Sequence, residues 1–131
     1  MKYKTLKLAA LTAAFIILGA GCSSTQTPAP PAATGPQPTT VAITLNPQGL
    51  DKKEVTIKVG DLVEFRNSDL KAHSPASDPH PSHTAYPEFD AKGGLKPGDT
   101  WTFKFEKAGT WKFHDHAAAK DKKFQGVVIV K

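Results

Sequence analysis

Two histidines with one aspartate between them, His114-Asp115-His116, stand at the end of an aromatic stretch, Trp111-Lys112-Phe113. On an extended strand, alternate residues point to the same side and lie about 6.6 Å apart along the chain. Both imidazoles can therefore reach one metal ion, or one ion each of a close pair. Imidazole is a good ligand for copper, zinc, iron and nickel. The triplet predicts a metal site that the rest of the domain must build or position.

The other three histidines fall in one stretch, Leu70 to Leu95, where the alternation of strands stops: His73, His80 and His83. A structureless loop of this length in a small domain is usually functional or disordered. Its residues Tyr86 and Phe89 favour an ordered cover. We therefore treat all five histidines of the chain as candidate metal ligands.

Strand alternation sets a geometric condition for this site. Trp111, Phe113 and Asp115 share one face, which the aromatic residues mark as inward, so His114 and His116 face outward. We expect the long loop to pack on that outer face and to clamp the metal against the strand. The alternative is that the strand ends near His114 and the alternation lapses.

Two roles are open for Asp115. It could be a direct or outer-sphere ligand near His73, or it could orient an imidazole by accepting a hydrogen bond from the ring N–H. We favour the second role.

The elements that must position these side chains are short strands. Apolar and polar residues alternate in five segments separated by Gly, Pro, Asn and Asp turns, at residues 41–45, 55–59, 62–66, 101–105 and 111–113, and a last apolar run covers 127–130. No amphipathic helical stretch is present. Period-two alternation with regular turns predicts an all-β sandwich or barrel over residues 40–131.

The first 39 residues do not fit this domain. A basic start and an apolar run from Leu8 to Ala20 predict a secretory signal over residues 1–21. Its ending resembles the lipobox of bacterial lipoproteins, although Leu18 stands four residues before the cysteine rather than three. We expect the only cysteine, Cys22, to be lipidated and residues 22–39, rich in proline, to form a tether. The expected location is outside the cytoplasm, on a membrane facing the periplasm or the cell exterior.

Charge argues against nucleic acid as a partner. The formal charge of +5 includes Lys2, Lys4 and Lys7 of the signal, and without them 14 basic and 12 acidic residues leave +2. The like charges do not gather in a basic run, so a solvated surface is the better interpretation.

From Val41 to Lys131 the chain resembles the cupredoxins, the family of plastocyanin and azurin. The resemblance rests on five segments: residues 55–61, the Asn67-Ser68-Asp69 turn leading to His73, residues 95–99, residues 108–114 and residues 126–130. It implies a Greek-key β-sandwich with the long histidine loop at its metal end. In this family a first histidine ligand follows the turn, where His73 falls, and a cysteine ligand stands where this chain has Asp115.

Two ligands of that family are missing here. No cysteine follows the aromatic strand, and no methionine follows His116, because Ala117-Ala118-Ala119 comes next. A blue copper site needs a thiolate with two imidazoles, so rapid blue-copper electron transfer is not expected. A site of histidines, or of histidines and carboxylate, suits Cu(II), and Zn(II) fits the same ligands.

The expected function is therefore copper(II) binding in trafficking, buffering or tolerance at the cell envelope, without enzymatic activity. The expected partners are the metal ion, the membrane through the lipid anchor, and a protein that exchanges copper or electrons. Three alternatives stay open: an atypical electron-transfer cupredoxin, a small copper enzyme acting on superoxide, and a metal-free interaction module on a tether.

Overall fold

The computed structural model describes residues 35–131. The predicted signal, Cys22 and most of the predicted tether lie outside these residues. Strands and short 3-10 helices (η) follow one another as β1 (Thr40–Asn46), β2 (Gly49–Leu50), β3 (Glu54–Ile57), β4 (Leu62–Asn67), β5 (Pro75–Ser77), β6 (Thr100–Lys104), β7 (Gly109–Asp115), η1 (His116–Ala118), η2 (Lys122–Phe124) and β8 (Gln125–Val130). Within the described residues, no helix is long and apolar enough to cross a membrane.

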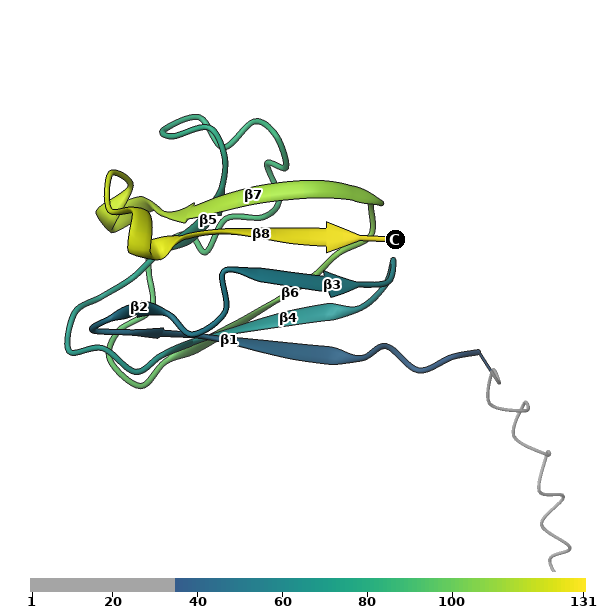
Figure 1. Ribbon diagram of the computed structural model, residues 1–131, viewed down its shortest axis with the longest axis horizontal. Coiled ribbons are helices and arrows are strands. Elements are labelled where there is room, and N and C mark those ends of the chain that lie inside the picture. The colour runs from purple at the N-terminus through teal and green to yellow at the C-terminus, as the bar shows by residue number, and fades with distance from the viewer. Residues whose placement is uncertain (1–34) are drawn as a thin grey trace, which may run out of the picture. The chain divides into compact units, whose positions relative to one another are not determined.

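The strands form two four-stranded sheets packed face to face, as Figure 1 shows. One sheet has the order β2-β1-β4-β6 and the other β3-β8-β7-β5. The pairs β1–β4 and β3–β8 are parallel, whereas the remaining neighbours are antiparallel. The predicted all-β sandwich is confirmed.

Alternation places the core between the sheets, as the sequence predicted. In β4, Val63 and Phe65 are fully buried, and Phe113 of β7 is 1 % exposed. The Phe65 and Phe113 rings meet edge to face, with centroids 5.3 Å apart. Burial of large aromatic rings contributes much of the stability of a small domain. The core thus fixes β7, the strand that ends in the histidine triplet.

The long loop is ordered and tied to the second sheet. It contains the short strand β5, which the sequence did not predict because Pro75-Ala76-Ser77 has no β-branched or aromatic residue. The Phe89 side chain is fully buried and that of Tyr86 is 2 % exposed. Both residues anchor the loop in the core, so the predicted ordered cover is confirmed. In Figure 1 the segment after β5 projects beyond β7, away from the first sheet.

The two ends of the sandwich differ in what they carry. At one end, the Leu62 N–H donates to the Thr39 carbonyl and the Val59 N–H to the Lys131 carbonyl. Gly109, where β7 begins, pairs with Val130 at this same end. β7 then runs to Asp115 at the other end. The chain therefore enters β1 at the end of the sandwich opposite to the triplet.

Candidate metal centre

Four of the five histidines converge in the structure: His80, His83, His114 and His116. Each offers one ring nitrogen, and these nitrogens all lie within 4.8 Å of one another. Two of the residues come from the long loop, one from the end of β7 and one from the start of η1. We call this group the histidine cluster. The predicted packing of loop on strand therefore brings together residues that are 30 positions apart or more.

Backbone hydrogen bonds hold the loop against β7. The Asp78 N–H donates to the Lys112 carbonyl (3.0 Å), and the Ala85 N–H donates to the Asp78 carbonyl (2.9 Å). Between them, the His83 N–H donates to the Pro79 carbonyl (2.8 Å), which closes a tight turn. The loop histidines are thus placed by a local fold that is docked on the strand.

His114 is the most deeply placed member of the cluster, with 2 % of its surface exposed. It faces outward from β7, yet Ala76 of β5 pairs beside it and the loop covers it. Its Nδ1 donates to Asp78 Oδ1 at 2.7 Å. Its Nε2 is buried and, within the described residues, has no hydrogen-bond partner. A buried polar atom without a hydrogen-bond partner lowers the stability of a folded protein. A metal ion bound at this nitrogen would remove that cost.

His83 is held in a similar way from the loop. Its Nδ1 donates to Asp90 Oδ2 at 2.9 Å, and its side chain is 9 % exposed. Its backbone has φ of 52°, the left-handed region that non-glycine residues adopt at a cost of about 1–2 kcal/mol. Strain of this kind is concentrated at functional sites, where the surroundings impose it.

His80 and His116 form the exposed side of the cluster. The His116 Nδ1 lies 3.0 Å from the His83 Nε2, and the centroids of the His80 and His116 rings are 4.7 Å apart. Desolvation, followed by the neighbouring imidazoles, lowers the pKa of His80 from its ordinary value. A lower pKa favours the neutral ring, which is the form that binds a metal.

A shallow hollow opens beside this exposed side. It is lined by His80, His116, Ala117–Ala119, Lys120 and Asp121. The alanines leave space close to the two rings. The cluster is therefore reachable from solvent only where its exposed histidines lie, whereas His83 and His114 are covered.

His73, which the sequence predicted as a candidate ligand, lies apart from the cluster. Its Nδ1 lies 2.7 Å from Asp115 Oδ2, and its Nε2 lies 3.2 Å from Asp69 Oδ2. The ring is 3 % exposed and packs on Phe124, with centroids 4.5 Å apart. A carboxylate oxygen lies within hydrogen-bond distance of each ring nitrogen, so neither nitrogen is open to a metal ion.

Asp115 does accept from an imidazole, as we favoured, but the ring is that of His73 and not one of the cluster. Its other oxygen accepts from the Ser74 N–H at 2.6 Å and from the Ala117 N–H at 3.2 Å. The second of these bonds caps η1, so the strand ends at Asp115 and His116 begins the helix. The expected packing of the loop on the strand therefore applies to His114. The alternative, in which the strand alternation lapses, applies to His116.

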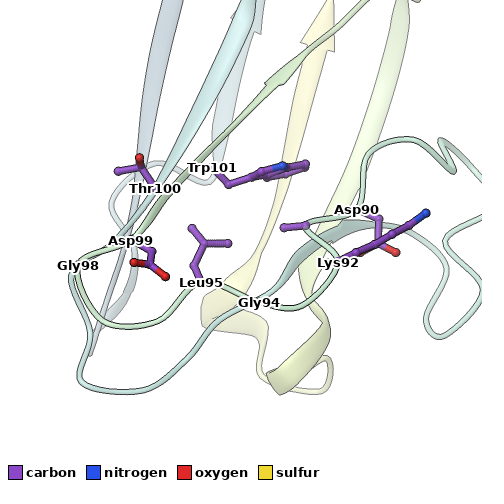
Figure 2. Close-up of a pocket in the computed structure, with 9 residues that line it drawn as sticks. Asp90, Lys92, Gly94, Leu95, Gly98, Asp99, Thr100 and Trp101 are labelled. Atoms are coloured by element: carbon purple, nitrogen blue, oxygen red, sulfur yellow. The ribbon is translucent and has the colours of Figure 1, made fainter.

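A larger pocket lies next to the cluster, behind Asp90. Figure 2 shows Asp90 and Asp99 on opposite sides of the pocket, and Trp101 lines the side nearest the strands. Asp90 thus contacts His83 on one side and solvent in this pocket on the other. The remaining lining residues include Lys92 and the backbone of Gly94 and Gly98.

The sequence did not identify the two carboxylates that hold the cluster, Asp78 and Asp90. A weak signal was available, because Asp78 precedes His80 by two residues in the same loop. Metal-binding histidines usually donate their second N–H to a carboxylate or carbonyl. That rule would have favoured nearby aspartates without showing which ring each one contacts.

The donor set consists of imidazole nitrogens alone, backed by carboxylates. The single cysteine and single methionine of the chain, Cys22 and Met1, are outside residues 35–131. Three features fit a metal that prefers imidazole: ring nitrogens that converge, a buried nitrogen without a hydrogen-bond partner among the described residues, and carboxylates behind the rings. The four histidines are the residues that could hold it.

Comparison with solved structures identifies the sandwich as a cupredoxin fold. A mutant of amicyanin in its Cu(I) form superimposes with a TM-score of 0.58 at 22% identity, covering 70% of this chain and 82% of that one. A reduced form of another amicyanin mutant gives a TM-score of 0.59, also at 22% identity, with the same coverage of both chains. A purple cupredoxin from Nitrosopumilus maritimus gives 0.54 at 20% identity, covering 69% and 98%. No protein-family model and no curated protein matches the chain. The likeness to known cupredoxins thus establishes the fold, and the function must be argued from the site.

Proposed function

We propose that this protein binds copper through the histidine cluster and holds it for trafficking, buffering or tolerance. The observation that carries the proposal is the buried Nε2 of His114, which has no hydrogen-bond partner in residues 35–131 and faces three further imidazoles. Among divalent metals, copper leads the affinity order for nitrogen sites. The solved amicyanin structures with the same fold are described in Cu(I) and oxidised forms, which supports copper over other imidazole-binding metals.

The donor set favours holding copper over fast electron transfer. Blue-copper centres use a thiolate beside two histidines, and the described domain has neither cysteine nor methionine. The exposed His80 and His116 give an exchanging partner access to the metal. We infer a binding protein rather than an enzyme.

The proposed setting is the cell envelope. The signal-like residues 1–21 and Cys22 support export and a lipid anchor, and the sandwich would then stand on a proline-rich tether. Metabolic labelling of the full chain with a radioactive fatty acid tests the anchor, with Cys22→Ser as the matched control. Label on both proteins, or on neither, would exclude lipidation at Cys22.

Titration of the purified domain with Cu(II) tests the metal site. We expect one tightly bound copper, a weak imidazole-type visible spectrum and no intense thiolate band. Zinc that binds more tightly than copper would change the assignment of the metal. No uptake of either metal would refute the proposed function, and a fast reversible redox couple would favour electron transfer.

A further inference from the structure

The carboxylates behind the rings suggest which nitrogen of each histidine faces the metal. We propose that Asp78 and Asp90 select the ligand atoms of the cluster, so that His114 and His83 bind through Nε2 and His116 binds through Nδ1. This inference rests on the proposed function. It adds two positioning residues. It also assigns Nε2 as the ligand atom in two histidines and Nδ1 in a third, which neither the fold nor the histidine spacing implies.

The first step concerns the two buried rings. A carboxylate oxygen only accepts hydrogen bonds, so the nitrogen facing it must carry the proton. The Nδ1 atoms of His114 and His83 face Asp78 and Asp90 at 2.7 and 2.9 Å. In each neutral ring the lone pair is therefore on Nε2. This assignment leaves free the His114 Nε2, which has no hydrogen-bond partner in the part of the chain that the structure describes.

The second step concerns His116. With its own Nδ1 donating to Asp90, the His83 Nε2 accepts a hydrogen bond from the His116 Nδ1 at 3.0 Å. These two nitrogens face each other inside the cluster. A metal ion between them requires the proton on the His116 Nδ1 to move to Nε2 of the same ring. His116 is exposed, so water can carry that proton and then solvate the new N–H.

The two carboxylates are not equally shielded. The Asp90 side chain is 18% exposed, whereas that of Asp78 is 42% exposed. Solvent weakens electrostatic interactions of exposed groups. The hydrogen bond from His83 to Asp90 is therefore the stronger of the two, even though the contact between His114 and Asp78 is shorter.

Long-range ¹H–¹⁵N NMR of the histidine rings tests the assignment directly. In the metal-free domain we expect His83 and His114 as Nδ1–H tautomers. With diamagnetic Zn(II) or Cu(I) added, the metal-dependent shifts should appear at Nε2 of His83 and His114 and at Nδ1 of His116. Metal bound through Nδ1 of His83 or His114, or through Nε2 of His116, would overturn the inference.

Substitution tests the positioning role. Asp78→Asn and Asp90→Asn replace an obligate acceptor by an amide that also donates, so the tautomer is no longer fixed. We expect copper affinity to fall roughly 10- to 100-fold, more for Asp90→Asn, together with a mixture of tautomers in NMR. Glu88→Gln is the matched control, because this carboxylate lies in the same loop but bonds to Lys107 and to no cluster histidine.

The outcomes distinguish the positioning role of the two aspartates from copper binding itself. Unchanged tautomers and affinity in both aspartate variants would overturn the positioning role while leaving copper binding in place. Absence of metal binding in the unsubstituted domain would remove the proposed function itself. An equal loss in Glu88→Gln would show that loop charge, and not contact with the rings, controls affinity.

Discussion

Two sites at the same end of the sandwich contain buried imidazoles, and they use them in opposite ways. In the histidine cluster, each of His83 and His114 donates from one nitrogen to a carboxylate and turns the other toward more imidazoles. His73 has a carboxylate at each nitrogen, Asp115 on one side and Asp69 on the other. One partner leaves a ring ready to bind a metal, whereas two partners make it part of the packing. The comparison shows that burial of a histidine alone does not indicate a ligand.

The largest contrast should appear on removal of two cluster histidines. We expect His114→Ala with His116→Ala to reduce copper affinity by more than the roughly 100-fold that loss of an outer partner can cost. Isothermal titration calorimetry measures this loss. Retained affinity in the double variant would show that the copper binds elsewhere in the chain.

Removal of His73 should have the reverse effect. His73→Ala leaves Asp115, which is 1 % exposed, without its imidazole partner. Removing one partner of a buried hydrogen bond costs about 1–3 kcal/mol, so the free energy of unfolding should fall by that order. Urea unfolding measures the stability, and copper stoichiometry should stay unchanged. A lost copper equivalent would contradict the separation of the two sites.

A smaller effect is expected for an exposed member of the cluster. His80→Ala removes one ligand at the solvent side, where water can take its place, and should weaken copper binding by about tenfold, or about 1.4 kcal/mol. Stability in urea should not change, since His80 is exposed. A loss as large as that in the double variant would mean that the exposed histidine is as important as the buried ones.

The smallest effect should depend on pH. Burial alone would raise the pKa of Asp69, but hydrogen bonds from His73 and from the Leu70 backbone outweigh it and lower the pKa. A group whose pKa is lower in the folded state stabilises the fold at pH values above its ordinary pKa. This stabilisation is lost as the pH falls through the pKa of the folded state. Asp69→Asn should therefore lower the melting temperature near neutral pH, and the difference should shrink toward pH about 3. A difference that is constant with pH would exclude a charge effect at this site.

The sequence was informative about the fold because alternation is a local property. Val63 and Phe65 are buried as their positions in the alternating segment predicted. β5 was missed since its burial comes from the loop that covers it and not from its own residues. For the site, spacing indicated the pairs His80/His83 and His114/His116.

The division between cluster and His73 could not be predicted, because it depends on contacts across the chain. Asp115 is adjacent in sequence to two cluster histidines, yet it points to the opposite face and meets a ring 42 positions away. The resemblance to cupredoxins placed His73 and Asp115 at two ligand positions of that family. In this chain those two positions are joined by a hydrogen bond of 2.7 Å.

The end of the sandwich at which the chain enters also determines how the protein can be mounted. Thr39 and Leu62 are hydrogen bonded at the end opposite to Asp115. A domain fixed to an electrode or a sensor surface at the start of β1 would therefore present the histidines to the bulk solution. Lys131 lies at that same end, so attachment through this residue would keep the orientation.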